Sequence, residues 1–240
     1  MKKVLVVILF LILSTVIYAT AVSVDTTGTM TDTGKTFVLD KFDCKATKGL
    51  LLVAVGMQSD NFQQVKDATF AGQTLTYLGE VSCEDKLKME IWYLLNPPSK
   101  EDTISISLDT DATVIISAIT LNDINQDTPF NNINTNQILC KDLAGIDFDY
   151  KTDPDSGVLT FILNNGESEF DKDLAQTEKV KNKSKKASDN ISTQLFLEIA
   201  SSAQTKKVPN KLAFAGTHIE YILEVLSTTG TSMLLGGERK

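Results

Sequence analysis

Short runs of alternating apolar and polar residues fill most of this chain. In the run DTISISLD, Ile104, Ile106 and Leu108 fall on one side and the two intervening serines on the other. That period of two is the pattern of a half-buried β-strand. The other runs are rich in β-branched and aromatic residues, and Gly, Pro, Asn and Asp separate them. The pattern predicts an all-β chain.

The expected strands lie in eleven runs, at residues 35–42, 49–57, 66–70, 73–81, 86–95, 102–109, 112–121, 156–163, 193–201, 211–216 and 218–227. Gly72 lies in the short link between two of them and predicts a hairpin. Residues 22–35, rich in Thr, Gly and Asp, are expected to form an extended lead-in or edge strand. We therefore predict one domain over residues 36–229, of a size that one β-sandwich or barrel fills, followed by a tail at 230–240.

The run 86–95 contains the only tryptophan, Trp92. One side of the expected strand is apolar, whereas the other begins with Lys88 and Glu90 before reaching Trp92. This pattern predicts a strand that passes from a solvated edge into a region covered on both faces. Pro97 and Pro98 end it, because proline cannot donate to a ladder. We expect Trp92 to anchor the core rather than to form a sugar-stacking platform, since its neighbours are apolar.

The chain begins with two lysines, an apolar run over residues 4–13 and the small-residue pattern Ala19-Thr20-Ala21. A basic start, a short apolar core and an A-x-A site are typical of a secretory signal peptide, here residues 1–21. The run is too short to span a membrane, which takes about 20 mostly apolar residues. We expect the mature protein to be secreted or at the cell surface, and not to span a membrane.

The net negative charge of the chain argues against one class of partner, nucleic acids. The formal net charge of −8 becomes −10 when Lys2 and Lys3 leave with the signal, and Arg239 is the only arginine. Nucleic-acid binding normally needs clustered Lys and Arg, so we expect no nucleic-acid partner. A large net charge instead keeps exported molecules apart and soluble.

Three cysteines, Cys44, Cys83 and Cys140, are widely and irregularly spaced. In an oxidising compartment, one disulfide with one cysteine left over is the simplest count, and three pairings satisfy it. Three buried, unpaired thiols are the alternative. The spacing and the single histidine, His218, argue against zinc.

Carboxylates gather in the segment DFDYKTDPDSG. Calcium prefers several oxygen ligands, and this segment predicts a candidate calcium site, although its spacing is not that of an EF-hand loop. The alternative is a hydrated acidic turn. No other cofactor is expected. The candidate ligands are Asp147, Asp149, Asp153 and Asp155.

Residues 168–190 are polar and lysine-rich, with few apolar residues at helical spacing. We expect a solvated excursion from the domain. Two glycosylation sequons fall there, at Asn182 and Asn190, and exposure would make both residues candidate acceptors.

No catalytic set is visible in the sequence. His218 is expected within a strand or at its start, and no nucleophile elbow accompanies it. A glycosidase pair of Glu90 and Glu101 needs a carboxylate separation that sequence does not give. We therefore expect a protein that is not an enzyme.

Several segments carry a resemblance: LLLVAVGM, ATFAGQTLTYLGEV, MEIWYLLNPPS, TISISLD and VIISAITLNDINQDTPF. In this order and spacing they resemble a sandwich module that recurs in large secreted and cell-surface proteins of bacteria and archaea. The likeness is closest over residues 50–130 and looser to residue 227. It implies a two-sheet antiparallel, jelly-roll-like β-sandwich and no catalytic residues. The abundant lysines, acids and cysteines depart from the module.

Together these observations predict an exported, non-catalytic surface or extracellular protein with a structural or adhesive role. Its expected partners are surface or matrix components, including glycans or further copies of the chain. A carbohydrate-binding module assisted by calcium is the alternative, and a secreted hydrolase is the weaker one.

Overall fold

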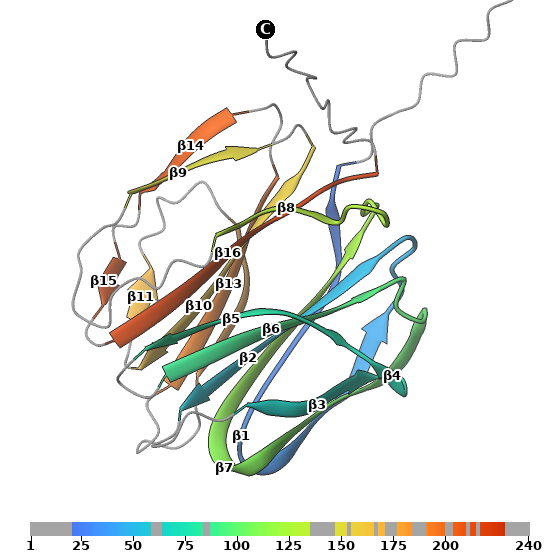
Figure 1. Ribbon diagram of the computed structural model, residues 1–240, viewed down its shortest axis with the longest axis vertical. Helices are drawn as coiled ribbons and strands as arrows, with labels where there is room; N and C mark the ends of the chain where they lie inside the picture. Colours follow the sequence, from blue (N-terminus) through green and yellow to red (C-terminus); the bar gives the residue numbers. More distant parts are fainter. Residues whose placement is uncertain are drawn as a thin grey trace, which may run out of the picture.

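A computed structural model describes residues 21–58, 64–83, 87–134, 147–152, 155–165, 168–170, 177–183, 191–199, 204–209, 212–214 and 217–228. All regular elements in these ranges are β-strands, which confirms the all-β prediction (Figure 1). The strands are β1 (Ser23–Cys44), β2 (Leu50–Gln58), β3 (Val65–Phe70), β4 (Gln73–Thr74), β5 (Thr76–Cys83), β6 (Leu87–Leu95), β7 (Lys100–Asn122), β8 (Phe130–Asn134), β9 (Asp147–Thr152), β10 (Gly157–Asn165), β11 (Ser168–Phe170), β12 (Thr177–Lys183), β13 (Ile191–Ile199), β14 (Gln204–Pro209), β15 (Leu212–Phe214) and β16 (Thr217–Val225).

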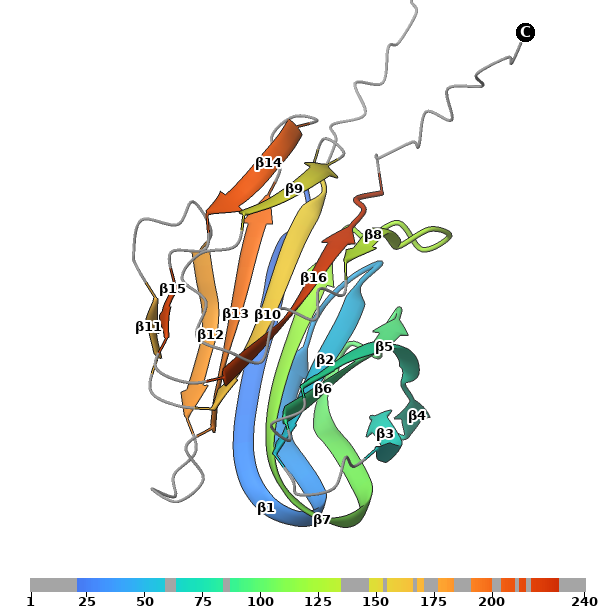
Figure 2. The same cartoon turned by 60° about the vertical axis from the view of Figure 1, so that its left-hand side comes forward.

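Two larger sheets contain most of the strands, and all their pairings are antiparallel. The first has seven strands in the order β4-β3-β7-β2-β6-β5, with β1 paired to β7. The second has five strands in the order β12-β13-β10-β16-β8. Two short pairs, β11-β15 and β14-β9, lie beside the second sheet in Figures 1 and 2.

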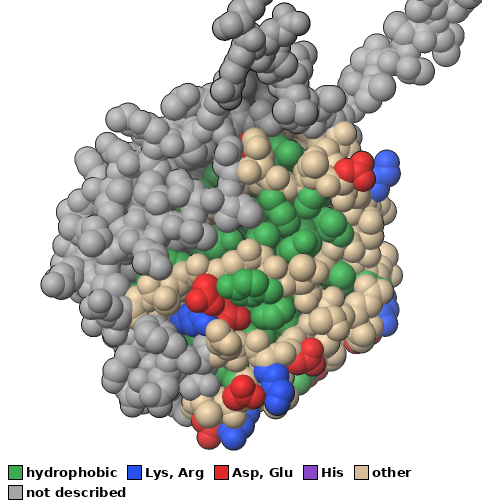
Figure 3. Space-filling view, viewed as in Figure 1, with side chains coloured by type: hydrophobic (Ala, Val, Ile, Leu, Met, Phe, Trp, Pro, Cys, Tyr) green, Lys and Arg blue, Asp and Glu red, His purple; other side chains and the backbone are tan. Residues whose placement is uncertain are grey.

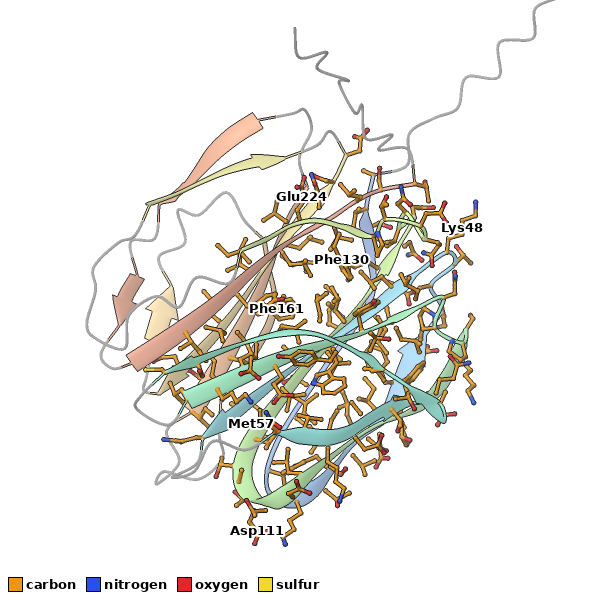
Figure 4. All side chains as sticks on the ribbon, in the orientation of Figure 1. Lys48, Met57, Asp111, Phe130, Phe161 and Glu224 are labelled. Carbon is orange, nitrogen blue, oxygen red and sulfur yellow. The ribbon has the colours of Figure 1, made fainter. Side chains whose placement is uncertain are left out.

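The seven-stranded sheet bends at β7, its longest strand. One edge of β7 pairs with β1 over nearly its whole length. Its other edge pairs with β3 over Ile104–Leu108 and with β2 over Thr113–Leu121. Two separate strands were predicted here, but 102–109 and 112–121 are halves of one bent strand. Asp111 projects at the outside of the bend, where it is exposed (Figure 4).

The chain itself joins the two ends of this sheet. β4 pairs with β3 at one end and β5 pairs with β6 at the other, yet only Leu75 separates β4 from β5. The backbone N–H of Leu75 donates to Ala68 of β3 at 2.8 Å. The sheet is therefore nearly closed into a barrel, as Figure 2 shows, and we call it the barrel-like sheet.

Two hydrophobic clusters form because β2 is apolar on both faces. Leu50, Leu52 and Ala54 pack with residues of the second sheet, among them Phe161, in the cluster between the sheets (Figure 4). The alternate residues of β2 pack inside the barrel-like sheet against side chains of β1, β3 and β7, in what we call the inner cluster. The sequence of a strand that is buried on both faces is a continuous apolar run, and LLLVAVGM is such a run.

The predicted hairpin at Gly72 is confirmed. Phe70 pairs with Gln73 across a two-residue turn, Ala71-Gly72, with φ of 53° and 78°. Two positive φ values are characteristic of a type I′ turn, whose twist matches that of the flanking strands. Gly72 adopts this conformation without the steric cost that Ala71 carries.

Two other expectations need adjustment. Residues 23–35, expected as a lead-in or edge strand, form the first half of β1 and pair with β7. The excursion expected over 168–190 includes β11 and β12, and β12 pairs with β13 at the edge of the second sheet. The predicted signal peptide at 1–21 and tail at 230–240 lie outside the described residues, apart from Ala21.

The cysteines differ in state. Cys83 on β5 is disulfide-bonded, whereas Cys44 is free and buried. Burial is the main cause that raises the pKa of the Cys44 thiol. Cys140 lies outside the described residues. The described part of the chain also contains no helix that could cross a membrane.

The two sheets approach closely at Gly79 of β5. A Cβ atom at this position would lie 2.7 Å from the hydroxyl of Tyr221 on β16. That hydroxyl is buried and has no hydrogen-bond partner among the described residues, and burial raises the pKa of Tyr221 to about 12.

We expect Gly79→Ala to lower the free energy of unfolding by about 1–3 kcal/mol, because it overpacks this contact. Tyr221→Phe should be nearly neutral or stabilising, since it removes an unsatisfied buried hydroxyl. The double variant should recover most of the loss. Urea unfolding of the four proteins measures the coupling, and strictly additive effects would contradict the contact.

Candidate functional site

Five side chains gather on one face of β5 and β6, at the end of the barrel-like sheet. We call them the Lys88 cluster: Tyr77, Glu80, Lys88, Glu90 and Trp92. Register explains the grouping, because Glu80 lies opposite Glu90 and Tyr77 lies opposite Trp92. Lys88, Glu90 and Trp92 alternate along β6 and so share a face.

A β-bulge brings Tyr77 to this face. Residues 77 and 80 would lie on opposite faces of a regular strand, since they are three positions apart. The register of β5 against β6 shifts between Tyr77 and Gly79, so that Leu78 and Gly79 occupy one step of the ladder. Such bulges redirect side chains next to functional sites. Here the bulge places the Tyr77 hydroxyl 3.2 Å from the Glu80 carboxylate, to which it donates.

Lys88 is the centre of the cluster. Its ammonium nitrogen lies 2.8 Å from Glu80 Oε2 and 2.9 Å from Glu90 Oε1. The side chains of Lys88 and Glu90 are only 4 % and 3 % exposed, whereas that of Glu80 is 41 % exposed. A buried charge is tolerated only when partners replace its hydration, and two carboxylates do so for this ammonium.

Glu90 also links the two ends of the barrel-like sheet. Its Oε2 accepts a hydrogen bond from the indole N–H of Trp92 at 3.1 Å. Its Oε1 accepts one from the backbone N–H of Val65, the first residue of β3, at 3.4 Å. No backbone ladder joins β3 to β6 within the described ranges. Side chains of the cluster therefore close the sheet where strand pairing does not.

Electrostatics fix the ionisation of the cluster. Burial by itself lowers the pKa of Lys88, but its hydrogen bonds to Glu80 and Glu90 outweigh burial and raise it. Burial, the negative charge of Glu80 and the hydrogen bond to Glu80 raise the pKa of Tyr77 to about 12. At neutral pH, Lys88 is thus an ammonium and Tyr77 a neutral phenol.

The burial of β6 contradicts the sequence prediction. A solvated start and a covered end were expected, but Leu87 to Ile91 are buried and the residues from Trp92 to Leu95 are half-buried. The prediction was wrong because Lys88 and Glu90 compensate each other inside the sheet. Sequence reasoning missed this cluster as a site. Its only signal was the alternation of opposite charges, Lys88 and Glu90, on an otherwise apolar strand.

Trp92 is half-buried and lies between the core and the surface. It packs against the inner cluster, as a core anchor does. It also contacts the ring of Tyr77 edge-to-face, with ring centroids 5.4 Å apart and an interplanar angle of 70°. Tyr77 itself is 46 % exposed. The indole thus joins the core to an exposed aromatic ring.

A second buried acid, Glu224 on β16, is held by hydrogen bonds. Ser156 Oγ donates to it at 2.8 Å and Asn131 Nδ2 at 3.2 Å, and Glu224 is 2 % exposed (Figure 4). These contacts join the start of β10 and β8 to β16. Glu224 therefore stabilises the second sheet.

The predicted calcium ligands are only partly described. Asp147 and Asp149 lie on β9, opposite Pro209 and Lys207 in register, and their side chains lie outside the described part. The backbone carbonyl of Asp155 accepts a hydrogen bond from the Val22 N–H at 3.3 Å. Asp153 lies outside the described residues. Within the described ranges, no group of three or more His, Cys, Asp or Glu side chains is placed to hold a metal ion.

The remaining candidates are also partly outside the described residues. Asn182 lies on β12 opposite Thr193, and Asn190 is not described. His218 lies on β16 opposite Asn164, and its side chain is not described. These positions stay predictions.

Within the Lys88 cluster, the two buried charges are bound to each other and two other groups face solvent. A general base or nucleophile needs a group that is free to exchange its proton with a substrate. Lys88 and Glu90 instead bind each other in a buried ion pair. The groups that face solvent are the ring of Tyr77 and the carboxylate of Glu80.

Comparison of the chain with protein-family models, with curated proteins and with solved structures finds no match.

We expect Lys88→Met to lower the free energy of unfolding by about 3–5 kcal/mol, because it leaves a carboxylate buried without its cation. Adding Glu90→Gln should recover most of the loss. Lys66→Met is the matched control, because Lys66 and Asp109 form an ion pair of 3.4 Å in which both side chains are about 70 % exposed. This substitution should lower the free energy of unfolding by less than about 0.5 kcal/mol. Chemical denaturation measures all three, and equal losses for Lys88→Met and Lys66→Met would refute the buried pair.

We expect two phenols of the folded protein, Tyr77 and Tyr221, to ionise near pH 12. A pKa raised in the folded state stabilises the fold below the unfolded value of about 10, and this contribution is lost as the pH rises through 12. Stability should therefore fall between pH 10 and 12. Ultraviolet titration of the phenols measures the ionisation, and Tyr77→Phe should remove one late transition. An unchanged number of late transitions in that variant would contradict the assignment.

Proposed function

We propose that this chain is an exported, non-catalytic protein of the cell surface or extracellular space, with a structural or adhesive role. The observation that carries the proposal is the disulfide bond of Cys83, because disulfides persist mainly in oxidising compartments. The basic, apolar and small-residue pattern of residues 1–21 supports the same localisation.

The buried charged side chains are bound by other residues of the same chain, which supports a non-catalytic role. Lys88 and Glu90 are bound to each other, and Glu224 is bound by Ser156 and Asn131. A secreted hydrolase is the weaker alternative, since Glu90, one member of the glycosidase pair considered from sequence, is committed to this network.

We further propose that the two larger sheets form a jelly-roll-like β-sandwich. Residues of both sheets share the hydrophobic cluster between them, and β16 contacts β5 and β6. This arrangement agrees with the module that the sequence resembles. Its partners would be surface or matrix components, including glycans or further copies of the chain, and a carbohydrate-binding module remains the alternative role.

Export is tested by producing the full chain and a version that lacks residues 1–21 in a bacterial host. We expect the full chain outside the cytoplasm, with a new N-terminus after Ala21. Cys83 should resist alkylation until reduction, whereas Cys44 should react once the protein is unfolded. Non-reduced peptide mapping should join Cys83 to Cys140, the one cysteine left in the sequence when Cys44 is free.

The version without residues 1–21 is the control and should stay in the cytoplasm with Cys83 reduced. A full chain that also stays there, with its first residues intact, would contradict the proposal.

A further inference from the structure

Tyr77 is unusually exposed for a large hydrophobic side chain in the described part of the chain. Among the described residues, only Tyr77 and Val38 are exposed large hydrophobic side chains, at 46 % and 44 %. Figure 3 shows acidic and basic side chains grouped beside hydrophobic ones on the face that carries β5 and β6. An aromatic ring next to charged groups at a surface is a common feature of binding sites.

The ring of Tyr77 is fixed before any ligand arrives. Its edge-to-face contact with Trp92 supports the ring, and its hydroxyl is held by Glu80. Trp92 is fixed in turn by its hydrogen bond to Glu90. A ligand therefore meets a preorganised ring, and little conformational entropy is lost when it binds.

Glu80 supplies a hydrogen-bond acceptor beside this ring. Both Lys88 and the Tyr77 hydroxyl contact its Oε2, so its Oε1 can accept hydrogen bonds from a ligand. Hydrogen bonds to an ionised acceptor are stronger than those between neutral groups. The β-bulge at Leu78 creates this combination, since a regular strand would separate Tyr77 from Glu80.

Charge limits the class of ligand. An anion would be repelled, because the two carboxylates of Glu80 and Glu90 outnumber the single, buried ammonium of Lys88. A neutral molecule with an apolar face for the ring and hydroxyl groups for the carboxylate fits both features. A pyranose sugar has these properties.

We propose that Tyr77 and Glu80 form a binding site for a neutral saccharide, with Trp92 as the support of the ring. This inference rests on the proposed extracellular role and names the partner to which the protein would adhere. Calcium takes no part in this proposal, because Glu80 offers one further carboxylate oxygen, fewer than calcium coordinates.

The first test is retention of the full, folded chain on insoluble neutral polysaccharides (cellulose, mannan and chitin), with and without EDTA. Soluble oligosaccharides of any polymer that retains the protein are then titrated while the emission of Trp92 is recorded. Trp92 is the only tryptophan, so its fluorescence reports on the site directly. We expect saturable binding that survives EDTA and changes this emission.

Substitutions assign the binding to these residues. Tyr77→Ala should weaken binding about tenfold, as loss of an aromatic contact does. Tyr77→Phe should retain most of it, because the ring remains. Glu80→Gln should weaken binding less than Tyr77→Ala, and Val38→Ala, the other exposed hydrophobic residue, is the matched control that should change nothing. Circular dichroism and thermal unfolding verify that each variant is folded.

Each outcome of these experiments either supports or overturns the proposed saccharide site. Failure of all three polymers to retain the protein, or equal binding by wild type and a folded Tyr77→Ala variant, would overturn the proposal. So would retention that EDTA abolishes, which would favour the acidic segment at 147–155. An exported protein without saccharide binding would refute this site alone, whereas binding by a protein that is not exported would refute the proposed localisation alone.

Discussion

The two apolar faces of β2 are the constraint on which this structure depends. A strand with apolar side chains on both faces must be covered on both faces, because burial of apolar surface is the main force that drives folding. The second sheet covers one face, which includes Leu50 and Leu52. The barrel-like sheet covers the other by bending back on itself around Leu51 and Val53. The bend of β7 and the long pairing of β1 follow from this need.

Bending a sheet brings its two ends together, and the Lys88 cluster lies where they meet. Burying an ion pair is costly, and an apolar pair of similar shape is often as stable. A buried pair of this kind can add little net stability and still fix the geometry around it. Glu90 has two oxygens, and their bonds to Val65 and Trp92 define how β3 lies relative to β6. The same bonds orient the aromatic side chains that reach the surface.

Much of the fold could be predicted from local pattern. The alternation of apolar and polar residues predicted most strands. Gly72 predicted a turn, and the structure forms it with two positive φ values. Alternation also grouped Lys88, Glu90 and Trp92 on one face. It could not show that this face is buried at Lys88, because burial depends on which strands the sheet brings opposite, and the partner Glu80 lies on another strand. The bulge at Leu78 could not be predicted either, because it depends on how β5 pairs with β6 and packs against Tyr221.

A barrel closed by side chains has a seam that a barrel closed by backbone pairing lacks. Strand edges on either side of the seam keep N–H and C=O groups that could pair with a strand from another molecule. Glu90 occupies one of these groups, the Val65 N–H, so the ion pair also shields an edge from foreign strands. In the extracellular setting that we propose for this protein, the same carboxylate would also limit aggregation through this edge.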